Sequence, residues 1–164
     1  MLPFMPELQI TTVGERDLVM TREFNAPRDL VFACYTRPEL IRRWLLGPEG
    51  WSMPVCEFDA RIGGKYRYVW RHNDGREMAM SGVLRDIAPP EKLVSTELFD
   101  DDWTGGEAVT SLVLTDRGGR TLMTQTVTYS SAEARAGALA SGMTSGLEMG
   151  FQRLDTVLGD MQED

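Results

Sequence analysis

Apolar and polar residues alternate along much of this chain with the two-residue period of a half-buried β-strand. The first such segment contains Leu18, Met20 and, after a slip of phase, Phe24. The period of two returns at Trp51 and continues to Tyr129, interrupted by turns rich in glycine and proline. This second stretch predicts six further strands in succession, and we expect neighbouring strands to be antiparallel.

Two short segments with helical spacing separate the first predicted strand from the other six. PRDLVFACYT carries apolar residues at helical spacing, and PELIRRWLL follows it after a break at Arg37-Pro38. The second segment ends at Gly47-Pro48, with Trp44 before this break and Trp51 after it. We expect the loop between the two tryptophans to lie at the mouth of a cavity.

The last segment, from Ser130 to Met161, is the longest helix candidate. Ser130 and Glu133 have the spacing of a capping box, and an apolar stripe follows one helical face. Gly142, Gly146 and Gly150 recur every four residues, and each weakens a helix by about 1 kcal/mol relative to alanine. Their presence predicts close approach to the sheet or to the contents of a cavity.

The order of these elements describes one α+β domain over residues 16–160. Residues 1–15 contain two prolines and lack the basic and continuous apolar regions of a signal peptide, so we expect a flexible leader. We therefore expect a cytoplasmic protein.

Charge and hydropathy narrow the range of partners. The chain has 17 basic and 25 acidic residues, a net charge of −8, and no basic run that could neutralise a series of phosphates. Its apolar runs are far shorter than the roughly 20 residues of a membrane helix. Neither nucleic acid nor a membrane is an expected partner.

The sequence contains few residues with the chemistry of a catalytic or metal centre. Cys34 and Cys56 form no C-x-x-C pair and there is no histidine cluster, so we expect free buried thiols and no metal site. His72, the single histidine, lies at a predicted hairpin tip beside Asn-Asp-Gly, where a turn role is expected rather than catalysis. No phosphate-binding loop or nucleophile elbow is present, and we expect no cofactor.

Two carboxylates keep a catalytic alternative open. Glu97 and Glu107 lie on strands predicted to run through the middle of the sheet, and either side chain could point inward. An inward carboxylate is a candidate general acid or base, or a hydrogen-bond partner for a ligand.

Large adaptable side chains share one parity of two predicted strands. Tyr66, Tyr68 and Trp70 alternate along one strand, and Met78 and Met80 follow across the hairpin. Such side chains pack irregular cores and also suit ligand binding. Because a curved sheet around one long helix leaves space between them, a small-molecule site is predicted there, and core packing remains the alternative.

Three regions of the chain resemble the signature regions of a known family. They are FNAPRDLVFACYTRPELIRRWLLGPEGW, CEFDARIGGKYRYVWRHNDGREMAMSGVLRDIAPPEKLVSTE and SGMTSGLEMGFQRLDTVL. They resemble the AHSA1-like family, which is named after the activator of Hsp90 ATPase and belongs to the START/Bet v 1-like (SRPBCC) superfamily. The resemblance covers about Arg16 to Leu158.

The resemblance implies a helix-grip fold with a deep hydrophobic cavity. In that fold a seven-stranded antiparallel sheet wraps around a long C-terminal helix, and two short helices lie between the first and second strands. The family commonly has Trp-Trp-Gly-Pro-x-Gly-Phe after the second helix, whereas this chain has WLLGPEGW. The local cavity wall is therefore its own, and a relative's ligand cannot be transferred to it.

Superfamily members bind lipids, sterols, polyketides or plant hormones, and some are cyclases or hydrolases. For this chain we expect an apolar or aromatic small molecule or a lipid, bound between sheet and helix. The expected ligand-binding residues are Trp44, Trp51, Tyr66, Tyr68, Trp70, Met78, Met80, Thr96, Leu112, Met143, Leu147 and Phe151.

Two alternative functions remain open, and so does the oligomeric state. The first is a cavity enzyme of cyclase or hydrolase type that uses Glu97 or Glu107, and it requires a buried carboxylate with a raised pKa. The second is a module that contacts an Hsp90-type chaperone through an exposed apolar patch. The chain is too short for the separate N-terminal domain of the eukaryotic activator, so full co-chaperone activity is not expected. A homodimer is a further alternative.

Overall fold

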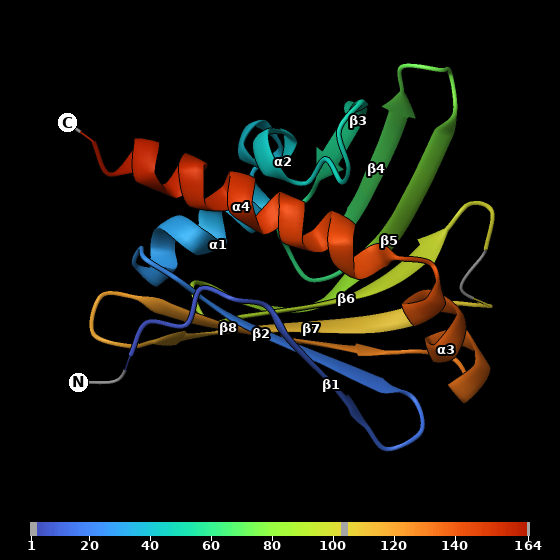
Figure 1. The fold of residues 1–164 in the computed structure, drawn as a ribbon, viewed down its shortest axis with the longest axis horizontal. Coiled ribbons are helices and arrows are strands. Elements are labelled where there is room, and N and C mark those ends of the chain that lie inside the picture. The colour runs from blue at the N-terminus through green and yellow to red at the C-terminus, as the bar shows by residue number, and fades with distance from the viewer. Residues whose placement is uncertain (1–2, 103–104, 164) are drawn as a thin grey trace.

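The computed structural model describes residues 3–102 and 105–163, which form eight strands and four helices (Figure 1). In chain order these are β1 (Gln9–Val13), β2 (Asp17–Phe24), α1 (Arg28–Thr36), α2 (Pro38–Trp44), β3 (Trp51–Phe58), β4 (Lys65–His72), β5 (Glu77–Ala88), β6 (Lys92–Phe99), β7 (Ala108–Asp116), β8 (Thr121–Thr128), α3 (Ala132–Ala140) and α4 (Met143–Met161).

The eight strands form one antiparallel sheet in the order β1-β2-β8-β7-β6-β5-β4-β3. The six strands from β3 to β8 follow one another as a meander, and β2 pairs with the last of them. The two short helices connect β2 to β3, which lie far apart in the sheet. This arrangement is the predicted α+β helix-grip fold.

The predicted number of strands, seven, was wrong by one. The additional strand is β1, which pairs with β2 along its length, from Gln9 opposite Thr21 to Val13 opposite Asp17. It falls inside the segment expected to be a flexible leader, of which residues 1 and 2 lie outside the described residues. Its side chains are mostly exposed, so it shows little of the burial pattern by which a strand is recognised in sequence.

Helix α4 lies across the concave face of the sheet, with α1 and α2 on the same side (Figure 1). Phe24 of β2 and Phe151 of α4 meet edge to face with ring centroids 5.7 Å apart, and both are buried. Beside them Arg22 of β2 donates two hydrogen bonds of 2.7 Å to the Asp155 carboxylate of α4. Apolar contact and an ion pair therefore fix this end of α4 on the sheet.

The C-terminal segment is two helices rather than the single helix that the pattern predicts. Gly142 separates α3 from α4 with a φ of 80°, a left-handed conformation that favours glycine. The cap is also shifted by one residue, because the Ser131 side chain accepts a hydrogen bond from the Ala134 N–H. Ser130 instead donates to the Gly105 carbonyl oxygen.

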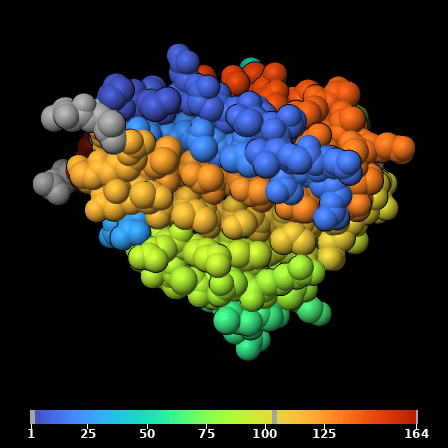
Figure 2. Space-filling view, turned by 90° about the horizontal axis from the view of Figure 1, so that it is seen from below, coloured from blue at the N-terminus to red at the C-terminus, as the bar shows by residue number. Residues whose placement is uncertain are grey.

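No helix of the described residues lies on the opposite face of the sheet (Figure 1). Figure 2 shows this face as adjacent bands of colour that follow the strand order, with β1 and β2 in blue beside the orange of β8. The space between sheet and helices therefore lies on one side of the sheet only.

Among the described residues, no helix is both long enough and apolar enough to span a membrane.

Candidate functional site

A cavity of about 630 Å³ lies between the sheet, α4 and the loop that joins α2 to β3. Every residue expected to bind a ligand lines it except Thr96. Its volume lies within the range of small-molecule pockets, roughly 300–1,000 Å³. The cavity extends from exposed residues, such as Pro48 and Ser141, to fully buried ones, such as Met20 and Phe151.

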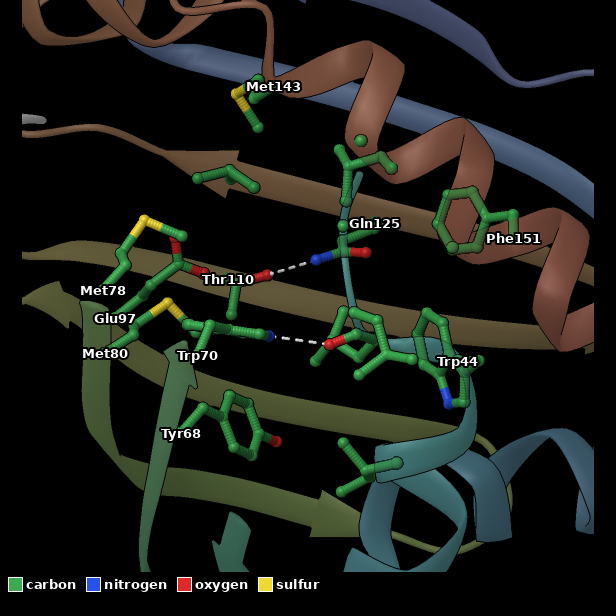
Figure 3. Close-up of a pocket in the computed structure, with 18 of the residues that line it drawn as sticks. Trp44, Tyr68, Trp70, Met78, Met80, Glu97, Thr110, Gln125, Met143 and Phe151 are labelled. Carbon is green, nitrogen blue, oxygen red and sulfur yellow. Dashed lines mark hydrogen bonds between the residues drawn. The ribbon is translucent and has the colours of Figure 1, made fainter. Parts of the chain in front are cut away.

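One wall of the cavity is a ladder of aromatic rings on β4. Tyr66, Tyr68 and Trp70 alternate along the strand, so all three face inward, with neighbouring ring centroids 5.0 and 5.8 Å apart. The Trp70 indole N–H donates to the Leu45 carbonyl oxygen over 2.8 Å (Figure 3). This hydrogen bond ties the wall to the α2–β3 loop.

The two tryptophans that flank the Gly-Pro break have different environments. Trp44 is 2% exposed, donates from its indole N–H to the Cys34 carbonyl oxygen over 2.8 Å, and stacks on Phe151. Trp51 is partly exposed and packs against the ring of His72, with centroids 5.1 Å apart. Both line the cavity, Trp44 deep within it and Trp51 near its outer end.

Glycines on α4 let the helix pass close to the α2–β3 segment. A Cβ atom at Gly150 would lie 3.2 Å from the Trp44 carbonyl oxygen, and one at Gly146 would lie 3.5 Å from the Pro48 ring. Arg153 adds a hydrogen bond of 2.6 Å to the Gly47 carbonyl oxygen. Gly146 and Gly150 thus allow close packing of α4 against the segment that encloses the cavity.

Thr96 points away from the cavity. Its hydroxyl oxygen accepts a hydrogen bond from the Val83 N–H over 2.9 Å, and its carbonyl oxygen accepts one from the Tyr66 hydroxyl over 2.6 Å. Ser95 and Glu97, its two neighbours in sequence, line the cavity instead. Inward residues of β6 are therefore the odd-numbered ones.

The strand register assembles a polar stripe on the otherwise apolar cavity floor. Ser95 of β6 lies opposite Thr110 of β7, and the Gln125 amide on β8 donates to the Thr110 hydroxyl over 3.1 Å. Figure 3 shows Glu97, Thr110 and Gln125 pointing into the same space as the cavity methionines. Ser95 and Gln125 were not among the expected site residues, and only the register between strands could have identified them.

The two candidate carboxylates lie in opposite environments. Glu107 is half exposed, lies 3.6 Å from the Arg85 guanidinium, and does not line the cavity. Glu97 lines the cavity, and burial raises the pKa of its carboxyl to about 7. Among the described residues, the Glu97 side chain has no hydrogen-bond or ion-pair partner.

Four tyrosines line the same cavity as Glu97. Burial is the main reason that the pKa of each hydroxyl is raised, to about 12 for Tyr129 and above the ordinary range for Tyr35, Tyr66 and Tyr68. These hydroxyls are therefore neutral donors and acceptors near pH 7. No lysine, arginine or histidine is found among the described residues that line the cavity.

Within the described residues, no group of three or more histidine, cysteine, aspartate or glutamate side chains is arranged to hold a metal ion. Cys34 and Cys56 are buried free thiols. The chemistry of the site therefore consists of apolar burial, neutral hydrogen-bonding groups and one carboxylate.

Comparison with known proteins places the chain among relatives of the same architecture. Residues 25–159 match the family described as activator of Hsp90 ATPase homolog 1-like protein. A crystal structure from Rhodobacter sphaeroides is 34% identical, with a TM-score of 0.88 over 94% of this chain and 99% of that one. None of the curated proteins compared matches this sequence.

Two more distant structures share the fold. A protein from Nitrosomonas europaea is 24% identical with a TM-score of 0.81, over 92% of this chain and 99% of that one. An AHSA1-like protein from Aeromonas hydrophila is 16% identical with a TM-score of 0.66, over 89% of this chain and 97% of that one.

Proposed function

The chain belongs to the activator of Hsp90 ATPase homolog 1-like family, and from that premise we propose that it binds an apolar or aromatic small molecule in the cavity between sheet and α4. The observation that carries the proposal is the cavity itself, about 630 Å³ with walls of aromatic, methionine and leucine side chains. A helix packed only for stability would leave little such space, because protein cores are filled to crystal-like density.

The driving force of the proposed function is apolar burial. Each Å² of apolar ligand surface removed from water contributes about 25 cal/mol, before the costs of association are subtracted. The rings of Tyr68 and Trp70 offer flat contact surfaces, while Met78 and Met80 adapt to the shape of the ligand. Hydroxyl and amide groups of the polar stripe would orient one polar end.

Neighbouring residues of β7 provide a matched test. Leu112 is 4% exposed and lines the cavity, whereas Val113 points to the opposite face and is 38% exposed. Leu112→Trp fills part of the cavity, and Val113→Trp adds the same ring outside it. The measurement is the fluorescence titration of each variant with the neutral dye N-phenyl-1-naphthylamine, after circular dichroism has shown that both are folded.

We expect the wild type and Val113→Trp to bind one dye molecule with similar affinity. Leu112→Trp is expected to bind about tenfold more weakly or worse, since a loss of about 1.4 kcal/mol of contact is already tenfold. Equal affinity in both variants, or no binding by the wild type, would refute the proposal.

Glu97 favours a second candidate function, acid or base catalysis within the same cavity. A carboxyl group whose pKa is about 7 suits proton transfer at neutral pH. Its neighbours, Ser95, Thr110 and Gln125, supply hydrogen bonds but no second group that titrates near pH 7. The cavity therefore supports binding more strongly than a two-group cyclase or hydrolase mechanism.

Contact with an Hsp90-type chaperone finds less support. It would require a contiguous apolar surface, and the large exposed apolar side chains of the described residues are spread over several elements. They are Phe4, Met5, Val13, Ile62, Val83, Leu98, Val113 and Met149. An unchanged Hsp90 ATPase rate in the presence of the protein is the expected result.

A further inference from the structure

The single carboxyl group of the cavity restricts the class of ligand more than the apolar walls do. Glu97 is the one carboxylate among its described lining residues, and no lysine, arginine or histidine lines it. The other polar groups that line the cavity include the neutral hydroxyls of four tyrosines and the Thr110–Gln125 pair; the tyrosines are Tyr35, Tyr66, Tyr68 and Tyr129. Among the residues that the structure describes, an ionised Glu97 thus has no partner.

A carboxylate inside this apolar cavity is unfavourable, because the cavity removes part of its hydration and no described side chain replaces it. A ligand that brings a cation would supply the missing partner through a charge-assisted hydrogen bond. A ligand that brings a carboxylate would place two like charges in one apolar space. Such a cavity would therefore discriminate between ligands by charge as well as by shape.

The aromatic rings that line the same cavity favour the same ligand chemistry. Ammonium groups are attracted to the faces of tryptophan and tyrosine rings. Tyr68 and Trp70 line the cavity on β4, two strands from Glu97 in the sheet. Carboxylate and aromatic faces together form the kind of surface that proteins use for organic cations.

We propose that Glu97 is the recognition group for a protonated amine at the end of an otherwise apolar ligand. This inference rests on the proposed function, since it names the ligand class of the same cavity. Amines are selected over neutral alcohols of the same length, and fatty acids are excluded.

Three probes that differ only in their polar end test this assignment: decylamine, decanol and decanoic acid. Each is titrated at pH 8.5, below its micelle concentration, by displacement of N-phenyl-1-naphthylamine from the wild type, Glu97→Gln and Glu107→Gln. Glu107→Gln is the matched control, because Glu107 carries the same charge outside the cavity.

In the wild type we expect decylamine to bind at least about tenfold more tightly than decanol, because one hydrogen bond to a charged group contributes about that much affinity. Decanoic acid should bind weakest. Glu97→Gln should abolish the preference for the amine while decanol binds as before. Glu107→Gln should behave as the wild type. Equal binding of amine and alcohol by the wild type, or an unchanged preference in Glu97→Gln, overturns the inference but leaves the proposed function standing. Failure of all three probes and of the dye overturns both.

The wild type provides a second test that needs no variant. At pH 5.5 Glu97 is protonated, because burial raises its pKa to about 7, whereas decylamine stays charged across the range. The tyrosines that line the cavity do not titrate in this range, since burial raises the pKa of each further. The ratio of amine to alcohol affinity should fall by about tenfold from pH 8.5 to pH 5.5. A ratio that does not change with pH contradicts the assignment.

Discussion

At the scale of single residues, Glu97 makes the stability of the protein depend on pH. Burial raises its carboxyl pKa from 4.5 to about 7, so the folded state holds the proton more tightly than the unfolded state. Its contribution to the free energy of unfolding is therefore greatest below pH 4.5 and is lost as the pH rises to about 7. The loss is on the order of 3 kcal/mol.

Glu97→Gln removes this dependence. We expect the variant to be more stable than the wild type at pH 8 by about 1–3 kcal/mol and close to it at pH 4.5, as measured by urea unfolding. Glu107→Gln, on the exposed side chain, should follow the wild type at both values. A wild-type protein that gains stability relative to Glu97→Gln between pH 4.5 and 8 would show that Glu97 is not buried as described.

The sequence pattern predicts most of the side chains that face the cavity, but the prediction for β6 was wrong at Thr96. On β4 the aromatic residues all share one parity, so the inward face is evident. On β6 apolar residues occur on both parities, Leu93 and Phe99 on one and Val94 and Leu98 on the other. A period of two cannot choose between such faces. Thr96 was therefore expected in place of Ser95, and Ser95 was missed.

At the scale of elements, the Arg22–Asp155 ion pair anchors α4 on the sheet. The Arg22 side chain is 6% exposed and that of Asp155 is 43% exposed, with 2.7 Å between the charged groups. Asp155→Ala leaves the Arg22 guanidinium buried without its partner, and we expect a loss of about 2 kcal/mol in the free energy of unfolding. Asp160 of α4 forms an exposed ion pair with Arg43 of α2, and Asp160→Ala should change the free energy of unfolding by about 0.5 kcal/mol or less. Equal losses of the free energy of unfolding in the two variants, measured with urea, would mean that the Arg22–Asp155 ion pair does not stabilise the fold.

Substitution of two glycines of α4 distinguishes the effect of close packing on stability from the effect of helix propensity. A Cβ at Gly159 meets nothing within 4 Å, so Gly159→Ala should stabilise the protein by about 0.5–1 kcal/mol. Gly150→Ala should give no such gain, because its Cβ would crowd the Trp44 carbonyl oxygen at 3.2 Å. Thermal unfolding of the two variants measures the difference. A gain at Gly150 as large as that at Gly159 would contradict the close approach of α4 to α2.

The break at Gly142 shows what a helical pattern leaves undetermined. Glycine occurs at Gly142, Gly146 and Gly150 with one spacing, yet only Gly142 adopts a positive φ and ends a helix. In sequence, a glycine in the left-handed conformation is identical to a glycine required for close packing. The strand β1 was missed for a related reason, since it is an exposed edge with little buried surface.

At the scale of the whole molecule, the fold follows from the order of its elements, whereas the cavity depends on how three of them close over the sheet. Helix α4 is brought near the α2–β3 loop by its glycines and by Arg153, and Trp70 attaches that loop to β4. These contacts join residues distant in sequence, so no local pattern predicts them. They hold the loop and α4 in position above the polar stripe of the cavity floor.

Methionine methyl groups report directly on the contents of this cavity. Met20, Met78, Met80 and Met143 line it, whereas the other described methionines, Met5, Met53, Met123, Met149 and Met161, do not. The most direct test of ligand binding is therefore a carbon-13 methyl spectrum of methionine-labelled protein titrated with N-phenyl-1-naphthylamine, whose rings shift nearby methyl signals. We predict that saturable shifts occur at the four lining methionines and not at the other five described ones. Shifts confined to Met149 on the exposed side of α4, or no shifts at saturating dye, would contradict the account.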